Sequence, residues 1–551
     1  MGVSEMTGGQ ALAAQLAREG IDIVFGLPGI QLDWAFDALY QARDRIRVVH
    51  TRHEQATTYM ADGYARTTGK PGTAIVVPGP GLLNAMAGLS TAYACNSPVL
   101  CLAGQIDSAW IDRQCGVLHE IPHQLQTART VTKWAGRAER PQAIPGRIHS
   151  AVCQALGGRP RPVVVELPPD VLRDRAPIRL RHAAPVTPAA PDPDAVTQAA
   201  RLLGRARRPL ILAGGGANQP EAAAPLRELA RQLEAPVVMT INGKGALSAR
   251  DYHAQTMLAA RELLPHADAV LAVGTRLVEP ATEPWGLSGQ PLIQLDIDPA
   301  EIGRNHRATV EMVADAALGL SALVDAVGRH NHTRASRREE LSALQERIDD
   351  RLFEVQPTAS YALAIREELP DEAIVVVDST QVGYWSWAGF PVYQPRTYLT
   401  AGYQGTLGFA YATALGAKAG NPETPVVSIS GDGGFLYTIQ ELATATRHGL
   451  NVVAIVFRDD AYGNVRMIQR RQFAGHVIAT ELDNPDFVKL AESFGVEGRR
   501  ATNPEGLRVA LRESLAADRP VLIEVPTGEI ASVFPILMAG RRKPTWCWTG
   551  E

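Results

Sequence analysis

The sequence predicts an α/β protein of three consecutive domains, each a doubly wound and mainly parallel sheet. Short apolar runs of strand length alternate with helical stretches along the chain, which is typical of parallel sheets with helical crossovers. The chain has 551 residues, enough for three domains of ordinary size. A proline-rich stretch and a charged stretch divide the apolar runs into three blocks.

The first predicted domain covers residues 1–182. Its expected strands are residues 23–25, 48–49, 74–77, 99–103 and 163–166. Prolines in residues 182–193 then mark a linker. The second predicted domain covers residues 195–328, and its expected strands are residues 210–213, 236–239, 269–273 and 292–298. The charged stretch from about residue 329 to 350 is expected to be a solvated linker and helix.

The third predicted domain covers residues 356–551. Its expected strands are residues 374–378, 426–429, 452–457 and 521–525. Asp432 follows the second of these strands and Asp459 follows the third. Because ligands of parallel sheets bind beyond the carboxyl ends of the strands, we expect both carboxylates at one edge of this sheet.

These two aspartates stand in glycine-containing stretches, GDGG at residues 431–434 and DDAYGN at residues 459–464. Mg2+ takes oxygen ligands, usually one or two carboxylates together with phosphate oxygens. Glycines at the start of a helix let backbone N–H groups approach a phosphate closely. The two stretches together therefore predict a divalent metal seated on a diphosphate.

The stretches and their spacing resemble the binding motif of the thiamine diphosphate (ThDP) enzymes, with Asp459 where that family usually has asparagine. The resemblance implies that Asp432, Asp459 and the backbone carbonyl of Ala461 hold Mg2+. The residues that it places at the diphosphate are Gly433, Gly434, Tyr462 and Gly463.

Glu54 lies where an apolar strand runs into a helix-like segment, residues 59–66. ThDP enzymes need one glutamate at such a junction, and Glu54 matches it. By that resemblance its carboxyl group bonds a ring nitrogen of the aminopyrimidine, so that the cofactor removes its own C2 proton. The plain alternative is a surface carboxylate paired with Arg52.

The segment AGYQGTLGF, residues 401–409, resembles the family segment that grips the pyrimidine. The carbonyl of Gly405 and the N–H of Leu407 would bond the ring, and the Leu407 side chain would force the cofactor into its bent, reactive shape. Gln381 is also assigned to the cofactor. A glycine-rich turn before a packed helix is the alternative.

Several residues of the first domain match acetolactate synthase and benzaldehyde lyase patterns. Pro28, Pro80 and Asn84 are expected on the pyrimidine side of the pocket, with ordinary turns as their alternative. His119 stands where the synthases carry a glutamine that faces the cofactor. It is a candidate catalytic residue that relays protons or orients a substrate carboxylate, or else a hydrogen-bonded structural histidine.

The glycine run at residues 214–216 could indicate a dinucleotide, but a lone glycine run is weak evidence. Biosynthetic acetolactate synthases hold FAD in this domain. Residues 255–261 lack the glycine-rich segment expected for that cofactor, so we do not expect FAD.

Composition excludes other classes of protein. The net charge of −4 and the absence of a basic cluster do not suggest nucleic acid, and no apolar stretch approaches the roughly 20 residues of a membrane span. The five cysteines are unpatterned and the N-terminus resembles no export signal, so we expect reduced thiols in a cytoplasmic protein. The family builds each site from two subunits, which implies a homodimer at least and a homotetramer by closed symmetry.

The predicted reaction is ThDP- and Mg2+-dependent decarboxylation of a 2-oxo acid, pyruvate or a similar one. The resulting enamine would be ligated to a second carbonyl, as in acetolactate synthases. The alternatives are simple decarboxylation, the making and breaking of acyloins as in benzaldehyde lyase, and a catalytically silent binding subunit. The presence of Glu54, Leu407 and the metal stretches argues against the last of these.

Overall fold

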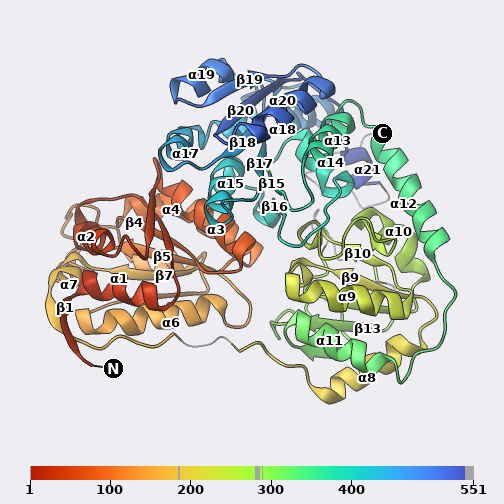
Figure 1. The fold of residues 1–551 in the computed structure, drawn as a ribbon, viewed down its shortest axis with the longest axis horizontal. Coiled ribbons are helices and arrows are strands. Elements are labelled where there is room, and N and C mark those ends of the chain that lie inside the picture. Colours follow the sequence, from red (N-terminus) through yellow and green to blue (C-terminus); the bar gives the residue numbers. More distant parts are fainter. Residues whose placement is uncertain (1, 184–186, 279–285, 288, 540–551) are drawn as a thin grey trace.

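The computed structural model describes residues 2–183, 187–278, 286–287 and 289–539. It contains three six-stranded sheets in which every pair of neighbouring strands is parallel. Each sheet belongs to one stretch of the chain, and Figure 1 shows the three domains side by side with helices around each sheet. The predicted fold class of three consecutive doubly wound, mainly parallel domains is confirmed.

The first sheet has the strand order β3-β2-β4-β5-β7-β6. Its strands are β2 (Ile23–Gly26), β3 (Arg47–His50), β4 (Gly72–Val76), β5 (Val99–Gly104), β6 (Trp134–Arg137) and β7 (Val163–Leu167). Helices α3 (Glu54–Thr68) and α4 (Pro80–Cys95) follow β3 and β4. A separate antiparallel ribbon of β1 (Ser4–Thr7) and β8 (Arg175–Ile178) joins the two ends of this domain.

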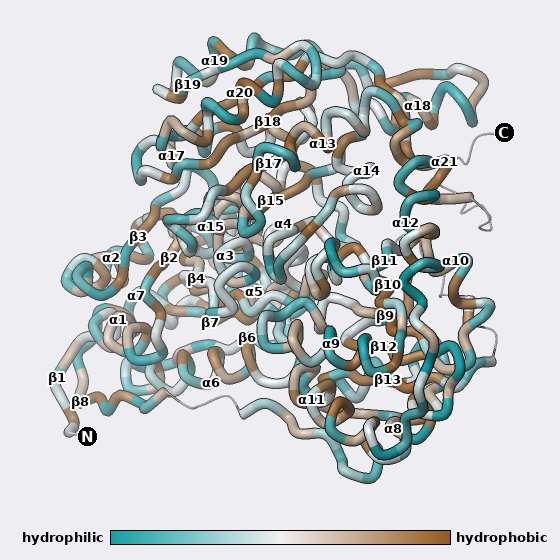
Figure 2. The backbone as a smooth tube through the Cα atoms, turned by 45° about the vertical axis from the view of Figure 1, so that its right-hand side comes forward, coloured by the Kyte–Doolittle hydropathy of each residue, from teal (hydrophilic) through white to brown (hydrophobic). Residues whose placement is uncertain are grey.

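The central sheet has the order β11-β10-β9-β12-β13-β14. Its strands are β9 (Pro209–Ala213), β10 (Val237–Met239), β11 (Ala254–Gln255), β12 (Ala269–Val273), β13 (Leu292–Asp296) and β14 (Val310–Val313). After it comes α12 (Arg338–Phe353), the helix expected from the charged stretch. Much of α12 is hydrophilic in Figure 2, as expected for a helix that borders solvent.

The third sheet has the order β16-β15-β17-β18-β20-β19. Its strands are β15 (Ile374–Val377), β16 (Tyr398–Thr400), β17 (Val426–Gly431), β18 (Val452–Arg458), β19 (Glu497–Arg500) and β20 (Val521–Pro526). Val and Ile occupy both faces of β15, β17 and β18, because helices cover both sides of a parallel sheet.

The first and third domains share one hydrophobic core. A single cluster of buried side chains runs from Phe25 and Val76 in the first sheet to Val376 and Val426 in the third. Between the sheets, α3 packs against α15 (Phe409–Gly420). Glycines allow this contact, because a Cβ at Gly63 would overlap the carbonyl of Thr413, and one at Gly416 would overlap that of Met60.

Candidate active site

Asp432 is the centre of a hydrogen-bonded cluster at the carboxyl end of the third sheet. It begins the one-turn helix α16 (Asp432–Phe435) directly after β17, and it is 1% exposed. One carboxylate oxygen accepts from the N–H of Gly433 at 2.8 Å. The other accepts from the N–H of Asp460 at 2.8 Å and from Asn484 Nδ2 at 2.8 Å. The side chain is therefore held in one orientation from both sides.

Asp459 reaches the same place from the neighbouring strand, because β17 and β18 run in register and end together. Its own N–H donates to Asp432 at 3.2 Å. Burial, followed by the charge of Asp432, raises the pKa of Asp459 to about 6. Two partly desolvated carboxylates repel each other unless a cation lies between them. Arg466, 4.0 Å from Asp459, offsets part of this repulsion, and a divalent metal between the two carboxylates would offset the rest.

The loop after Asp459 is fixed by a second segment of the chain. The N–H of Tyr462 donates to the carbonyl of Thr480 at 2.8 Å, and the N–H of Leu482 donates to that of Asp460 at 2.9 Å. Ala461, whose carbonyl is the predicted third ligand, forms an isolated bridge with Glu481 in this pairing. Gly463 follows and begins α18 (Gly463–Gln472), where a Cβ would overlap the Asp459 carboxylate.

The glycines after Asp432 pack closely against neighbouring residues. A Cβ at Gly433 would lie 2.8 Å from the ring of Tyr462, and one at Gly434 would lie 3.3 Å from Asp378 Oδ2. Several buried acceptors nearby have no hydrogen-bond partner among the described residues. They are Gln381 Oε1, Asn464 Oδ1 and Asn484 Oδ1. Buried polar atoms are normally satisfied, so these oxygens indicate that a polar group belongs here.

These observations fit a metal-bound diphosphate. Among the described residues, no group of three or more His, Cys, Asp or Glu side chains could hold a metal by itself. Mg2+ commonly relies on one or two carboxylates and completes its shell with phosphate oxygens and water. Asp432 and Asp459 supply the carboxylates, and glycines beside them let backbone N–H groups approach a phosphate.

The loop with Gly405 and Leu407 lies between the third domain and α4. Gly405 is exposed and has φ of 60°, a left-handed conformation that favours glycine. The hydroxyls of Thr406 and Thr91 are 2.8 Å apart. The N–H of Gly408 donates to Asp378 Oδ2 at 2.8 Å, so this buried carboxylate fixes the end of the loop. Burial raises the pKa of Asp378 to about 6.

Glu54 is the first residue of α3, and its partner is Asn84 rather than Arg52. Asn84 Nδ2 donates to Glu54 Oε2 at 3.0 Å. Asn84 lies one turn into α4, which begins at Pro80 shortly after β4 ends. The first turn of α4 therefore lies beside the first residue of α3. The structure thus brings together three predicted residues from two helices: Glu54, Pro80 and Asn84.

His119 and Pro28 lie on the same side of the first domain. His119 has φ of 66°, and its Nδ1 lies 3.1 Å from Gln31 Oε1. Its backbone packs on Gly79, where no Cβ would fit, which places it beside Pro80. Pro28 is exposed in the loop after β2. The side chain of His119 therefore has a structural partner, and its catalytic role stays a prediction.

Within one chain the predicted residues form two groups. Among the described residues, no hydrogen bond or ion pair joins Glu54 to Asp432, Asp459 or the Gly405 loop. Three residues that contact the predicted ones were not singled out from the sequence: Asp378, Asn484 and Glu441. Glu441 accepts hydrogen bonds from the backbone just before Glu54. Only Asp378 had a visible signal, as an aspartate that ends an expected strand.

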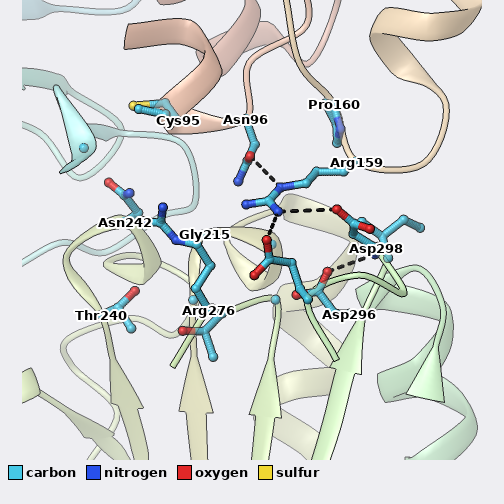
Figure 3. Close-up of a pocket in the computed structure, with 18 of the residues that line it drawn as sticks. Cys95, Asn96, Arg159, Pro160, Gly215, Thr240, Asn242, Arg276, Asp296 and Asp298 are labelled. Atoms are coloured by element: carbon cyan, nitrogen blue, oxygen red, sulfur yellow. Dashed lines mark hydrogen bonds and ion pairs between the residues drawn. The ribbon is translucent and has the colours of Figure 1, made fainter. Parts of the chain in front are cut away.

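A cavity of about 1100 Å3 lies where the three domains meet (Figure 3). It is lined by the glycine run of residues 214–216 and by Asp296 at the end of β13. A Cβ at Gly214 or Gly216 would overlap the backbone of Gly274, so these two glycines serve chain packing. Arg159 reaches into the cavity from the first domain and pairs with Glu301 and, at 3.4 Å, with Asp298. The expectation that no FAD binds here stays a prediction.

The four described cysteines, Cys95, Cys101, Cys115 and Cys153, are free, as expected, and Cys547 lies outside the described residues. No helix among the described residues is both long and apolar enough to cross a membrane.

Comparisons with known proteins agree with the three domains. Residues 6–128, 196–323 and 378–525 match the N-terminal TPP binding domain, the central domain and the C-terminal TPP binding domain of thiamine pyrophosphate enzymes. These matches fall within the three predicted domains without testing their boundaries.

Three relatives are similar over almost the whole chain. The probable acetolactate synthase large subunit of Methanocaldococcus jannaschii is 33% identical over 98% of this chain and 94% of its own length. The probable 2-ketoarginine decarboxylase of Pseudomonas aeruginosa is 34% identical over 94% of each chain. Acetolactate synthase isozyme 2 large subunit of Escherichia coli is 30% identical over 97% of this chain and 98% of its own length. The chain belongs to the acetolactate synthase-like family of ThDP-dependent enzymes.

Proposed function

We propose that this enzyme decarboxylates a 2-oxo acid, pyruvate or a similar one, and ligates the remaining fragment to a second carbonyl compound. The observation that carries the proposal is the presence of both half-sites, Glu54 with Asn84 and Asp432 with Asp459. The names of the acetolactate synthase relatives support ligation as the outcome.

Each half-site has a distinct task in this proposal. Asp432, Asp459 and the carbonyl of Ala461 hold Mg2+, and N–H groups near Gly433 and Gly463 bind the diphosphate. Bound ThDP supplies an electron sink for the carbon that loses carbon dioxide. Glu54 holds a proton at the aminopyrimidine, and Asn84 orients the Glu54 carboxylate by donating to it. Leu407 would contact the rings of the cofactor.

We further propose that a second copy of the chain completes the site, giving a homodimer at least and a homotetramer by closed symmetry. Both groups of site residues lie beside exposed apolar side chains. Those near Pro28 and Asn84 include Ile30, Trp34 and Leu83, and those near Gly405 and Tyr462 include Tyr403, Tyr437 and Val465. Exposed apolar groups around an incomplete site are typical of an interface. The free cysteines support the cytoplasm as its compartment.

The test is to incubate the purified protein with ThDP, Mg2+ and pyruvate, and to measure acetolactate and acetaldehyde. Acetolactate as the main product is expected. Acetaldehyde alone would favour the second candidate, simple decarboxylation, which the decarboxylase relative supports. If neither forms, other 2-oxo acids and acyloins are to be tried with the same cofactors, and failure of all of them would favour a catalytically silent binding subunit.

A further inference from the structure

Glu441 joins the third domain to the segment that carries Glu54. It ends the short helix η8 (Ile439–Glu441) and is fully buried. The backbone N–H of Arg52 donates to both carboxylate oxygens of Glu441, each at 3.1 Å. The backbone N–H of His53 donates to Oε1 of Glu441 at 3.1 Å. Arg52 and His53 are the two residues directly before Glu54, so one side chain holds the approach to α3.

Arg52 and His53 lead directly into Glu54, the first residue of α3, so a change in their position would move the Glu54 backbone. N–H groups ahead of a first helical turn have no partner within the helix, and here Glu441 supplies that partner for both. The orientation of Glu441 is itself fixed, because Thr444 Oγ1 donates to Oε2 at 2.6 Å. Burial raises the pKa of Glu441 to about 7, while its three donors act in the opposite direction. A buried carboxyl is costly to keep, and its three hydrogen bonds offset that cost.

The segment that ends at Glu441 also contacts the cofactor residues. It begins at Asp432, and Thr438 Oγ1 donates to the carbonyl of Gly408 at 3.0 Å. Gly408 closes the loop that contains Gly405 and Leu407. Residues 432–441 therefore touch the metal seat, the pyrimidine loop and the start of α3.

We propose that Glu441 is a positioning residue for Glu54, which sets the direction of the catalytic carboxylate by holding the N–H groups of Arg52 and His53. This inference rests on the proposed function, in which Glu54 governs proton loss from the cofactor. It adds a residue that touches neither cofactor nor substrate and acts through Glu54.

The test measures hydrogen–deuterium exchange at C2 of ThDP, with Mg2+ and without substrate, by NMR of the quenched cofactor. Glu441→Gln keeps one oxygen for the two N–H groups but loses the charge and the second acceptor, and Glu441→Leu loses both acceptors. We expect exchange about 10-fold slower in the first variant and about 100-fold slower in the second, since misplacement of a reacting group by about 1 Å has effects of this size. Affinity for ThDP should stay within about 3-fold of wild type, because the diphosphate contacts are untouched.

Glu54→Gln and the double variant Glu54→Gln/Glu441→Gln separate positioning from structure. If Glu441 acts through Glu54, the double variant exchanges no more slowly than Glu54→Gln alone. A further loss in the double variant, or unchanged exchange in Glu441→Gln, overturns the inference. Gln440→Ala in the same turn is the matched control and should exchange like wild type.

Two other outcomes are decisive. If Glu54→Gln itself exchanges at the wild-type rate, the proposed role of Glu54 fails and the positioning role fails with it. If Glu441→Leu does not fold, Glu441→Gln still decides the question, because its shape is nearly that of the native side chain.

Discussion

The central and third sheets are similar in architecture, but the edges at the carboxyl ends of their strands carry different side chains. The third-sheet edge, beyond β15, β17 and β18, brings two carboxylates together beside glycines that pack against Tyr462 and Asp378. The central-sheet edge, beyond β9, β12 and β13, also has glycines and one buried aspartate, Asp296. There, however, an arginine from the first domain, Arg159, neutralises the acidic side chains Asp298 and Glu301. Two parallel sheets of the same kind thus differ in the charged side chains that their loops bring to the edge.

The largest expected effect is at the third-sheet edge. Asp432→Ala removes one proposed metal ligand and the acceptor that organises the loop at Asp459, so Mg2+-dependent retention of ThDP should fall by more than about 100-fold. Asp296→Ala is the matched change at the central-sheet edge and should leave retention unaltered. Equilibrium dialysis with ThDP and Mg2+ measures both, and normal retention in Asp432→Ala would move the metal site elsewhere.

A smaller effect is expected from adding a methyl group to the glycine turn after Asp432. In Gly434→Ala the new methyl would press within 3.3 Å of Asp378 Oδ2 and 3.4 Å of the Gly408 nitrogen, so ThDP affinity should drop about 10-fold through a displaced loop. Gly215→Ala places its methyl 3.4 Å from Asn242 Cβ at the other edge. That variant should bind ThDP like wild type, and an equal loss in the two would erase the distinction between the edges.

Arg159→Ala tests the joint at the central-sheet edge. The Arg159 side chain is 9% exposed and that of Glu301 is 3% exposed, so the pair is largely desolvated. Its loss should lower the free energy of unfolding by about 1–2 kcal/mol, less than for an isolated buried pair because Arg304 also contacts Glu301 at 2.7 Å. Denaturant unfolding would measure this. A large loss of ThDP affinity without destabilisation would instead assign Arg159 to the cofactor.

Lys244 gives the smallest effect over any one pH unit, and it concerns how the central domain is attached. Its amine donates to the carbonyls of Ser386 at 2.9 Å and Trp387 at 3.3 Å in the third domain, and burial lowers its pKa to about 7. The unfolded chain keeps this proton up to about pH 10.5, so folding becomes more favourable as pH rises from about 7 to 10.5. We expect the free energy of unfolding of the wild type to rise by about 0.5–1 kcal/mol per pH unit relative to that of Lys244→Met. Parallel pH profiles of unfolding for the two proteins would contradict it.

The sequence predicted the fold through its fully buried strands. Central strands such as β5, β12 and β18 are apolar on both faces, and their predicted ends lie within one or two residues of the observed ones. The edge strands β6, β14 and β19 were not predicted, because they are short and carry polar or exposed residues. The β1–β8 ribbon was not predicted, because its strands lie at opposite ends of the first domain.

The candidate site was predictable where local stretches carry it. Asp432 and Asp459 stand in short motifs directly after strands, and Glu54 stands at a strand-to-helix junction. Asn484 and Glu441 have no such local signal, because their meaning lies in contacts with residues distant in sequence, Asp432 and the backbone at 52–53. Such pairings arise only once the domains have packed.

The glycine contact between α3 and α15 limits the motion of the first domain relative to the third. Because the two helices touch through their backbones at Gly63 and Gly416 and share one hydrophobic core, the first and third domains of a chain should turn as a single rigid body. Entry of reactants would then depend on surface segments such as residues 461–482 rather than on a hinge. Native-state amide exchange should place α3 and α15 in one slow-opening class, and a fast-opening α15 beside a protected α3 would show that the two domains part.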